Sequence, residues 1–264
     1  MFGHRDFKTK QWEAIKSVIS EKRDCLMIAH AGYGKSLIYQ FPPVFLNKIA
    51  LIISPLIGLI NDQVFYLKDK NVKVCILDYL DCDESISKYN IIYVTPEHYG
   101  TDCCKGRLEE VKDNLCLIAV DEAHCIARYG SDYLESYKNL EQLKKTFPEI
   151  PLIALTSTAI PKVQTYIIEL LQMVDPITIE TPLDRTNLRY TREIMTNPLQ
   201  DICPYLTNLD GGSTIIYCLD YFGCDRVACM LTSQDFICRI YSKDTNREDN
   251  KQTIKEFRNN KLKM

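Results

Sequence analysis

The segment Cys25–Ser36 reads CLMIAHAGYGKS and decides the fold. Its first five residues are apolar, as in a buried strand, and the apolar-rich sequence after it predicts a helix. Between the two, Gly32 and Gly34 let the backbone curl so that successive N–H groups can surround a phosphate, which the helix N-terminus also attracts. Lys35 would reach the β- and γ-phosphates of a nucleotide, and the Ser36 hydroxyl would bind Mg²⁺. The segment therefore predicts a nucleoside-triphosphate site.

An acidic pair, Asp121 and Glu122, directly follows the apolar run Leu115–Val120 and begins the tetrapeptide Asp-Glu-Ala-His that ends at His124. An α/β sheet binds its ligands at the carboxyl ends of its strands. Asp121 can hold Mg²⁺ through water, and Glu122 can orient and polarise an attacking water. The tetrapeptide alone could be the exposed start of a helix, but after a phosphate loop it is far more specific. We therefore predict that Lys35, Asp121 and Glu122 are the catalytic residues of a nucleotide hydrolase.

Short apolar runs alternate with amphipathic stretches along the chain, which predicts an α/β fold with a parallel sheet flanked by helices. The predicted strands are Cys25–Ala29, Ile49–Ser54, Val72–Leu77, Ile91–Thr95, Leu115–Val120, Leu152–Thr156 and Ile177–Glu180. The predicted helices between them are Thr9–Ser20, Lys35–Leu46, Leu56–Lys70, Tyr133–Thr146 and Lys162–Met173. Ser54 followed by Pro55 is typical of an N-cap with proline at the first helical position, and Thr158 to Pro161 is similar.

The pattern lapses in a polar stretch, so we expect a first domain at residues 1–181, a linker at 182–197 and a second unit at 198–264. The elements predicted for the second unit are a helix near Leu199–Leu206, a strand Thr214–Cys218, a helix Asp220–Thr232, a strand Phe236–Tyr241 and a helix Arg247–Asn259. Two strands are too few for an independent α/β core, so we expect this second domain to be partial. Its last helix could contact DNA, but an amphipathic cover helix is the more ordinary interpretation.

Composition is that of an average soluble chain: 264 residues, 46% apolar and 25% charged, with no apolar stretch long enough to span a bilayer. The N-terminus has no secretory signal, so we expect an intracellular protein without a membrane partner. The twelve cysteines lack the spacing of zinc ligands, and we interpret most of them as small buried hydrophobic residues. The net charge of −3 is not the strongly positive charge expected of a protein that binds nucleic acid by its overall charge. Any binding of nucleic acid must therefore come from local loops.

The motifs resemble those of RecQ-type DNA helicases of superfamily 2, closest to the Werner-syndrome type, over nearly the whole chain. The resemblance implies a RecA-like first domain that binds ATP and Mg²⁺, with Ser36 and Asp121 as the Mg²⁺ ligands. Phe7-Lys8-Thr9-Lys10-Gln11 matches the motif in which glutamine reads adenine, although an ordinary glutamine at a helix start has the same pattern. The residues expected to bind the nucleotide are Lys8, Gln11, Ala31, Gly32, Tyr33, Gly34, Lys35 and Ser36.

Two segments resemble the DNA-contacting motifs of the family: Ile53-Ser54-Pro55-Leu56-Ile57 through Asp62-Gln63, and Tyr93-Val94-Thr95-Pro96-Glu97. Hydroxyls and N–H groups at helix starts bind phosphates without reading the sequence, although on the pattern alone a simple helix cap is the more ordinary interpretation of each segment. Tyr129 and Tyr133 lie where the family has an aromatic-rich loop that senses single-stranded DNA, and they keep surfaces on which bases can stack. The resemblance further implies that His124, Thr156 and Thr158 couple hydrolysis to movement.

The chain also departs from the family pattern. In the aromatic-rich loop the family histidine is Ser131 and its arginine is Leu134, and Ala31 replaces a threonine of the phosphate loop. The motif with the arginine finger, the zinc-binding subdomain and the winged helix have no counterpart in these residues. We therefore expect this chain alone to bind ATP, to hydrolyse it slowly, and to need an intact helicase or a missing C-terminal segment as partner.

The resemblance implies a 3′–5′ DNA helicase that acts on single-stranded DNA, or on duplex with a single-stranded tail, in the nucleus during DNA repair and recombination. A second hypothesis is a non-catalytic ATP- or DNA-binding module, favoured by the departures but not by the intact Gln11, Lys35, Ser36, Asp121 and Glu122. A kinase or GTPase is a weak third, since the chain lacks an Asn-Lys-x-Asp guanine-reading motif.

Overall fold

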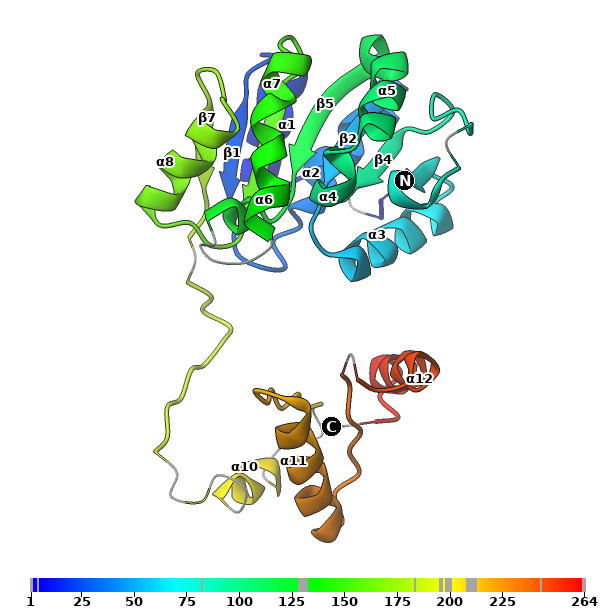
Figure 1. Ribbon diagram of the computed structural model, residues 1–264. Coiled ribbons are helices and arrows are strands. Elements are labelled where there is room, and N and C mark those ends of the chain that lie inside the picture. The colour runs from blue at the N-terminus through cyan, green and yellow to red at the C-terminus, as the bar shows by residue number, and fades with distance from the viewer. Residues whose placement is uncertain are drawn as a thin grey trace. The chain divides into compact units, whose positions relative to one another are not determined.

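The computed structural model describes residues 2–3, 5–81, 83–127, 133–182, 184–194, 197, 201–207, 213–242 and 244–262. The chain divides into two compact units, Met1–Thr186 and Asn187–Met264, and each is described by itself. In the first unit a central sheet lies between two layers of helices (Figure 1). None of the described helices is both long enough and apolar enough to cross a bilayer.

The sheet of the first unit has seven strands in the order β3-β4-β2-β5-β6-β1-β7, and every neighbouring pair is parallel. The strands are β1 (Cys25–Ile28), β2 (Ile49–Ile53), β3 (Val74–Ile76), β4 (Ile91–Val94), β5 (Leu115–Val120), β6 (Leu152–Thr156) and β7 (Ile177–Glu180). All seven predicted strands of this unit are therefore present, within two residues at each end. Because parallel strands need crossover connections, the chain passes a helix or a longer loop over one face of the sheet between them.

Alternate residues of each strand pack on opposite faces, which gives the unit two apolar cores. On one face Met27 and Ile52 pack with α1 (Thr9–Ile19), α2 (Ser36–Leu46) and α3 (Ile57–Asp69). On the other face Leu26 and Leu51 pack with the remaining helices of the unit. These are α5 (Asp102–Val111), α6 (Tyr133–Lys138), α7 (Leu143–Thr146) and α8 (Pro161–Leu170).

Three details of the first unit differ from the prediction. Ser54 is not an N-cap: its N–H donates to the Val94 carbonyl (3.1 Å) and so extends the β2 ladder, and α3 begins only at Ile57. The predicted helix Tyr133–Thr146 is broken by a 3₁₀ turn, η4 (Asn139–Gln142). The cap predicted at Thr95 begins the short α4 (Pro96–Tyr99), whereas α5 was not predicted, because it is capped by a threonine side chain in a polar stretch rather than marked by a long apolar face.

A buried carboxylate holds the amino-terminal edge of the sheet together. Asp24, which is 2% exposed, accepts hydrogen bonds from the backbone N–H of Leu152 (2.8 Å) and of Val174 (2.8 Å). It also pairs with the Lys144 ammonium at 3.1 Å. These contacts hold the starts of β1 and β6 side by side and so set the register of the two strands. The positions of the loops at the opposite, carboxyl edge of the sheet depend on that register.

The second unit contains α10 (Cys203–Thr207), α11 (Tyr221–Ser233) and α12 (Arg247–Arg258). The helices predicted at Asp220–Thr232 and Arg247–Asn259 are thus confirmed, whereas the first part of the helix predicted near Leu199 lies outside the described residues. The strands predicted at Thr214–Cys218 and Phe236–Tyr241 are wrong, because neither has a backbone ladder partner among the described residues.

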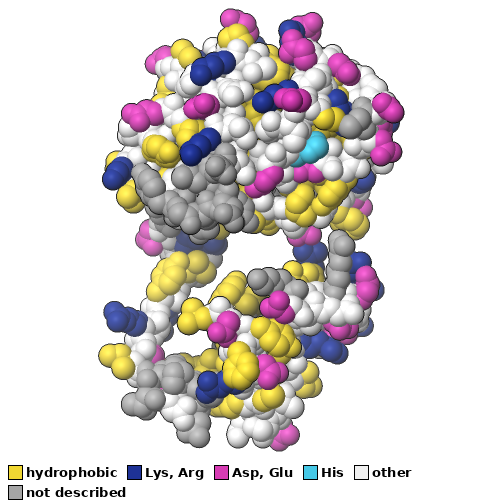
Figure 2. All heavy atoms as spheres, in the orientation of Figure 1, with side chains coloured by type: hydrophobic (Ala, Val, Ile, Leu, Met, Phe, Trp, Pro, Cys, Tyr) yellow, Lys and Arg dark blue, Asp and Glu magenta, His cyan; other side chains and the backbone are white. Residues whose placement is uncertain are grey.

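Apolar side chains without a strand partner remain on the surface of the second unit (Figure 2). Tyr217 is 90% exposed and Phe222 is 74% exposed. Together with α11 and α12, the two extended segments line an apolar hollow of about 520 Å³.

The cysteines fit the interpretation as buried apolar residues only in part. Burial raises the pKa of the thiols of Cys25, Cys75 and Cys104 to about 12 and that of Cys116 to about 11, so these four are unreactive. Cys103 and Cys229 are exposed. Within the described part of the chain no cluster of cysteine, histidine and acidic side chains could hold a metal ion.

Candidate active site

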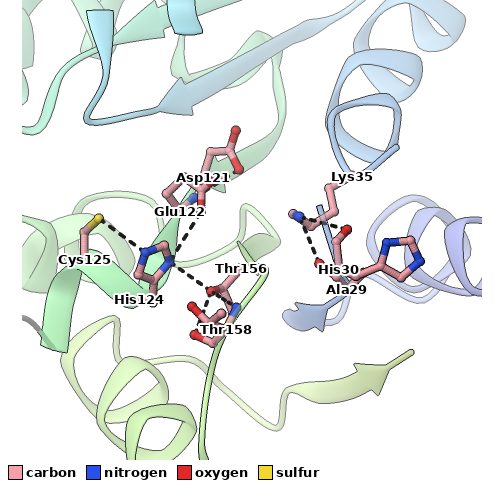
Figure 3. Close-up of polar contacts among 9 residues, drawn as sticks. All are labelled: Ala29, His30, Lys35, Asp121, Glu122, His124, Cys125, Thr156 and Thr158. Atoms are coloured by element: carbon pink, nitrogen blue, oxygen red, sulfur yellow. Dashed lines mark hydrogen bonds and ion pairs between the residues drawn. The ribbon is translucent and has the colours of Figure 1, made fainter. Parts of the chain in front are cut away.

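The strand order brings three loops together at the carboxyl edge of the sheet. Strand β6 lies between β1 and β5, so the loop that follows β1 faces the loops that follow β6 and β5. These loops carry the phosphate-loop residues, Thr156 with Thr158, and the acidic pair with His124, and Figure 3 shows their side chains directed toward one space. Segments far apart in the sequence therefore form one candidate site.

The loop after β1 has the shape that its glycines predict. Gly32 (φ +77°) and Gly34 (φ +92°) have backbone angles that other residues rarely adopt. The half-buried Lys35 lies at the start of α2, and its ammonium donates to the Ala29 carbonyl at 2.9 Å. Burial lowers the pKa of Lys35, while the carboxylates of Glu122 and Asp121 oppose that shift, so all three side chains share one electrostatic environment.

The predicted adenine-reading segment lies against the same loop. Gln11 is buried: its amide nitrogen donates to the Gly34 carbonyl at 2.9 Å, and its amide oxygen accepts from the Lys8 N–H at 2.9 Å. The Lys8 ammonium donates to the Tyr33 carbonyl (2.8 Å) and lies 4.5 Å from the centre of the Tyr33 ring. Gln11 must therefore exchange contacts with the loop for contacts with a base if it is to read adenine.

The acidic pair is held rigidly after β5. The Asp121 N–H donates to the Ile53 carbonyl (2.8 Å), and one Asp121 carboxylate oxygen accepts from the Glu122 N–H at 3.0 Å. The other oxygen accepts from the hydroxyl of Tyr39 at 3.0 Å. Burial, and then the neighbouring Glu122, raise the pKa of Asp121. Glu122 has a φ of +50°, a strained angle for a residue with a side chain.

His124 connects the acidic pair to the loop after β6. Its Nδ1 lies 3.1 Å from the Thr156 hydroxyl oxygen and 3.3 Å from Glu122 Oε2 (Figure 3). The Thr156 hydroxyl already donates to the Thr158 carbonyl and accepts from the Thr158 N–H, both at 3.1 Å. Because the hydroxyl hydrogen is already used, the remaining lone pair of the Thr156 oxygen can act only as a hydrogen-bond acceptor toward His124. This geometry therefore favours the His124 tautomer that carries hydrogen on Nδ1.

The donor set at this edge fits Mg²⁺. Mg²⁺ prefers oxygen ligands, keeps several waters, and is usually held by one or two carboxylates together with substrate phosphates. Glu122 Oε2 is a buried carboxylate oxygen that accepts no hydrogen bond in the structure and whose ion-pair contact is with His124 Nδ1 at 3.3 Å, so it retains acceptor capacity for a water. Ser36, the first residue of α2, and Asp121 both interact with the Tyr39 hydroxyl, so the two predicted ligands face the same point.

The predicted nucleic-acid contacts are less exposed than the sequence suggests. Ser54 and Pro55 are buried, and Thr95 is 7% exposed. Thr95 caps α4 by accepting the His98 N–H, as predicted, while its hydroxyl donates to the Asp78 carboxylate at 2.5 Å. Tyr129 lies outside the described residues, and of Tyr133 the structure describes only its position as the first residue of α6.

The structure adds three residues that sequence reasoning missed. Tyr39 contacts Asp121, Asp78 holds Thr95, and Arg185 donates from its guanidinium to the Ala31 carbonyl at 3.2 Å. Only Tyr39 carried a signal in the sequence, since it is followed by Gln40 to form a polar pair in the first turns of an otherwise apolar helix. The other two contacts join residues from separate elements, which no local pattern reports.

The comparisons with known proteins agree with this geometry. The model of the DEAD/DEAH box helicase family matches residues 8–166, and the chain belongs to that family. The bifunctional 3′-5′ exonuclease/ATP-dependent helicase WRN of Mus musculus is 39% identical in an alignment that covers 91% of this chain and 18% of WRN. The ATP-dependent DNA helicase RecQ of Pasteurella multocida is 30% identical in an alignment that covers 100% of this chain and 43% of that protein.

These relatives include a RecQ helicase, in agreement with the resemblance that the sequence motifs carry. It spans less than half the length of either relative. The DNA-bound crystal structure of the DUF1998 helicase MrfA covers 99% of this chain and 42% of its own, with a TM-score of 0.73 at 14% identity. That likeness concerns the fold alone, and with the parallel sheet it confirms the RecA-like prediction.

Proposed function

We propose that this chain is the motor portion of an ATP-dependent 3′–5′ DNA helicase, which binds Mg²⁺ and ATP at the carboxyl edge of β1, β6 and β5. The observation that carries the proposal is the convergence of Lys35, Asp121 and Glu122, which come from two separate loops that the strand order β5-β6-β1 brings to one edge of the sheet (Figure 3). The names of the relatives, helicases acting with ATP, support the same function. Residues 1–181, 182–197 and 198–264 are then motor domain, linker and partial second motor domain.

The side chains have distinct roles in this proposal. The Lys35 ammonium leaves the Ala29 carbonyl and binds the β- and γ-phosphates, where it gains a charged acceptor in place of a neutral one. Glu122 Oε2 orients the attacking water, and His124 keeps that carboxylate in place. Ser36 and Asp121 would hold Mg²⁺, which when bound would neutralise charge on the phosphates. Thr156 and Thr158 pass any movement of His124 to the loop after β6.

Nucleic acid binds, in the proposal, at the segments after β2 and β4 and at Tyr129 and Tyr133. Because the net charge is −3, binding depends on a few local contacts and is weak in the absence of nucleotide. The DNA substrate, the polarity, the slow turnover by this chain alone and the nuclear location that the resemblance implies all belong to the proposal.

The proposal is tested by nucleotide binding and turnover of the purified 264-residue chain. We expect a fluorescent ATP analogue to bind in the presence of Mg²⁺ and Lys35→Ala to abolish binding, whereas Lys48→Ala, an exposed lysine after α2, leaves it unchanged. Absence of nucleotide binding by the wild-type chain contradicts the proposal.

A second set of measurements addresses the nucleic acid. ATP turnover is followed with single-stranded DNA, with RNA of the same sequence, and with duplexes that carry a 3′ or a 5′ tail. Stimulation by DNA with a 3′ tail supports the proposed substrate and polarity, and preferential stimulation by RNA contradicts it. Binding of both ligands with no turnover under any condition favours the non-catalytic module.

A further inference from the structure

Two consecutive side chains of α2 connect the candidate nucleotide site to the two segments predicted to contact nucleic acid. Tyr39 and Gln40 lie on the second turn of this helix, whose first residue is Ser36 of the phosphate loop. Both are buried: Tyr39 is fully covered and Gln40 is 2% exposed. Polar groups in such positions are costly unless they are paired, so their partners are specific.

Tyr39 faces the nucleotide side. Its hydroxyl donates to Asp121 Oδ2 at 3.0 Å and also interacts with the Ser36 hydroxyl. Of the acceptor positions of Asp121, one is therefore taken by Tyr39 and another by the Glu122 N–H. This leaves the carboxylate with a fixed orientation toward the space between the loops.

Gln40 faces the other side. Its amide nitrogen donates to Gln63 Oε1 at 2.7 Å and to the Tyr93 hydroxyl at 3.1 Å. Gln63 belongs to α3, the helix that follows Ser54 and Pro55. Tyr93 belongs to β4, which ends one residue before Thr95.

The Tyr93 hydroxyl accepts from Gln40 at 3.1 Å, and Tyr93 lies in the same buried cluster as Tyr39 on this face of the sheet. The buried polar cluster is thus Asp121, Tyr39, Tyr93, Gln40 and Gln63, and it runs from the loop after β5 to α3. Every member lies on the sheet face covered by α1, α2 and α3 or at its edge. A shift of α2 on phosphate binding must move Tyr39 and Gln40 together, because they are neighbours on one rigid helix.

We propose that Tyr39 and Gln40 are positioning residues that couple nucleotide binding to nucleic-acid binding, through the contacts of Tyr39 with Asp121 and of Gln40 with Gln63 and Tyr93. The inference rests on the proposed function, because it presupposes that both ligands bind. Coupling is a free energy shared by two sites and is reciprocal, so each ligand changes the affinity for the other by the same factor.

The test measures that factor in the whole chain. The Kd for a fluorescently labelled oligothymidylate is determined by anisotropy with and without a non-hydrolysable Mg·ATP analogue. The Kd for the nucleotide is determined with and without DNA. We expect a change of at least about fivefold in the wild-type chain, within the usual range of allosteric coupling. In Gln40→Met we expect less than about twofold, with each ligand still bound in the absence of the other.

Tyr39→Phe tests the other half of the cluster. It removes only the hydroxyl, and we expect weaker nucleotide binding with Mg²⁺ but unchanged binding in EDTA, together with reduced coupling. Tyr89→Phe is the matched control, because the Tyr89 hydroxyl also donates to a carboxylate, that of Glu84 at 2.8 Å, but Tyr89 precedes the amino end of β4, at the edge of the sheet opposite the candidate site. Gln63→Met replaces Gln40→Met if the latter does not fold, since Gln63 is only half-buried.

The outcomes separate this inference from the proposed function. If the wild-type chain binds both ligands with coupling, and Gln40→Met or Gln63→Met leaves the factor unchanged, the inference is overturned while the function stands. If Tyr89→Phe lowers the factor as much as Tyr39→Phe, the effect is a general loss of stability and the inference is overturned as well. If the wild-type chain binds no nucleotide, both fail.

Discussion

Replacement of Asp24 by alanine is expected to destabilise the first unit without changing the candidate site. The 2% exposed carboxylate accepts from two backbone N–H groups and pairs with Lys144, whose side chain is only 9% exposed. Breaking a buried ion pair by removing one partner costs about 3–5 kcal/mol, and each buried donor left without an acceptor costs about 1–3 kcal/mol. Lys144 keeps its hydrogen bond to the Ile150 carbonyl, so the total loss of stability is smaller than the sum of these costs.

We therefore expect Asp24→Ala to lower the free energy of unfolding by about 4 kcal/mol. For a unit of this size, that corresponds to a fall of roughly 8–16 °C in the melting temperature. Asp24→Asn keeps one acceptor oxygen and should cost about half as much. Asp175→Asn is the control, because the Asp175 side chain is 85% exposed, its pair with Arg23 is worth at most about 1 kcal/mol, and asparagine tolerates the φ of +41° at this position.

The assays are urea denaturation followed by circular dichroism and, well below the melting temperature, titration with a fluorescent ATP analogue. Asp24 precedes β1 at the edge opposite the candidate site, so we expect the nucleotide Kd to stay within about twofold, which is about 0.4 kcal/mol. A loss of less than about 1 kcal/mol in Asp24→Ala would refute the energetic reasoning. A nucleotide Kd that changes in the folded variant would refute the separation of the two edges.

Three further predictions address the site and the second unit. Burial raises the pKa of Asp121, so its ionised form destabilises the fold, and Asp121→Asn should melt at a higher temperature at pH 8. Scanning calorimetry should show this difference shrinking as the pH falls through the raised pKa toward the ordinary pKa of an aspartate. Gly34→Ala should weaken nucleotide binding at least about tenfold in a fluorescence titration, because φ is +92° and the new Cβ would lie 2.7 Å from Gln11 Nε2. Asp220→Ala should cost about 1 kcal/mol, seen as faster hydrogen exchange in α11, because Asp220 caps that helix by accepting from Gly223 N–H at 2.7 Å.

The strands and the phosphate loop of the first unit could be predicted from the sequence because their signals are local. An uninterrupted apolar run such as Leu115–Val120 is buried along its whole length, and this is what a central parallel strand requires. Gly32 and Gly34 both adopt positive φ, as a phosphate loop demands. Local periodicity and local backbone freedom were sufficient for these elements.

Other features depend on partners that the local sequence does not name. Ser54-Pro55 has the composition of a helix start, yet the Ser54 N–H is used by the neighbouring strand β4. The segments Thr214–Cys218 and Phe236–Tyr241 have the composition of strands, but a strand exists only through its ladder. Tyr39 was missed for the same reason, because its role depends on Asp121, which lies on another element.

Three cationic side chains donate to backbone carbonyls of the phosphate loop. Lys35, Lys8 and Arg185 donate to the carbonyls of Ala29, Tyr33 and Ala31 respectively. In the proposed function, a triphosphate that binds Lys35 must displace the bond of Lys35 to Ala29, so the binding free energy is a difference between two paired states rather than a sum of new contacts. The exchange is favourable because a phosphate oxygen is charged and a backbone carbonyl is not.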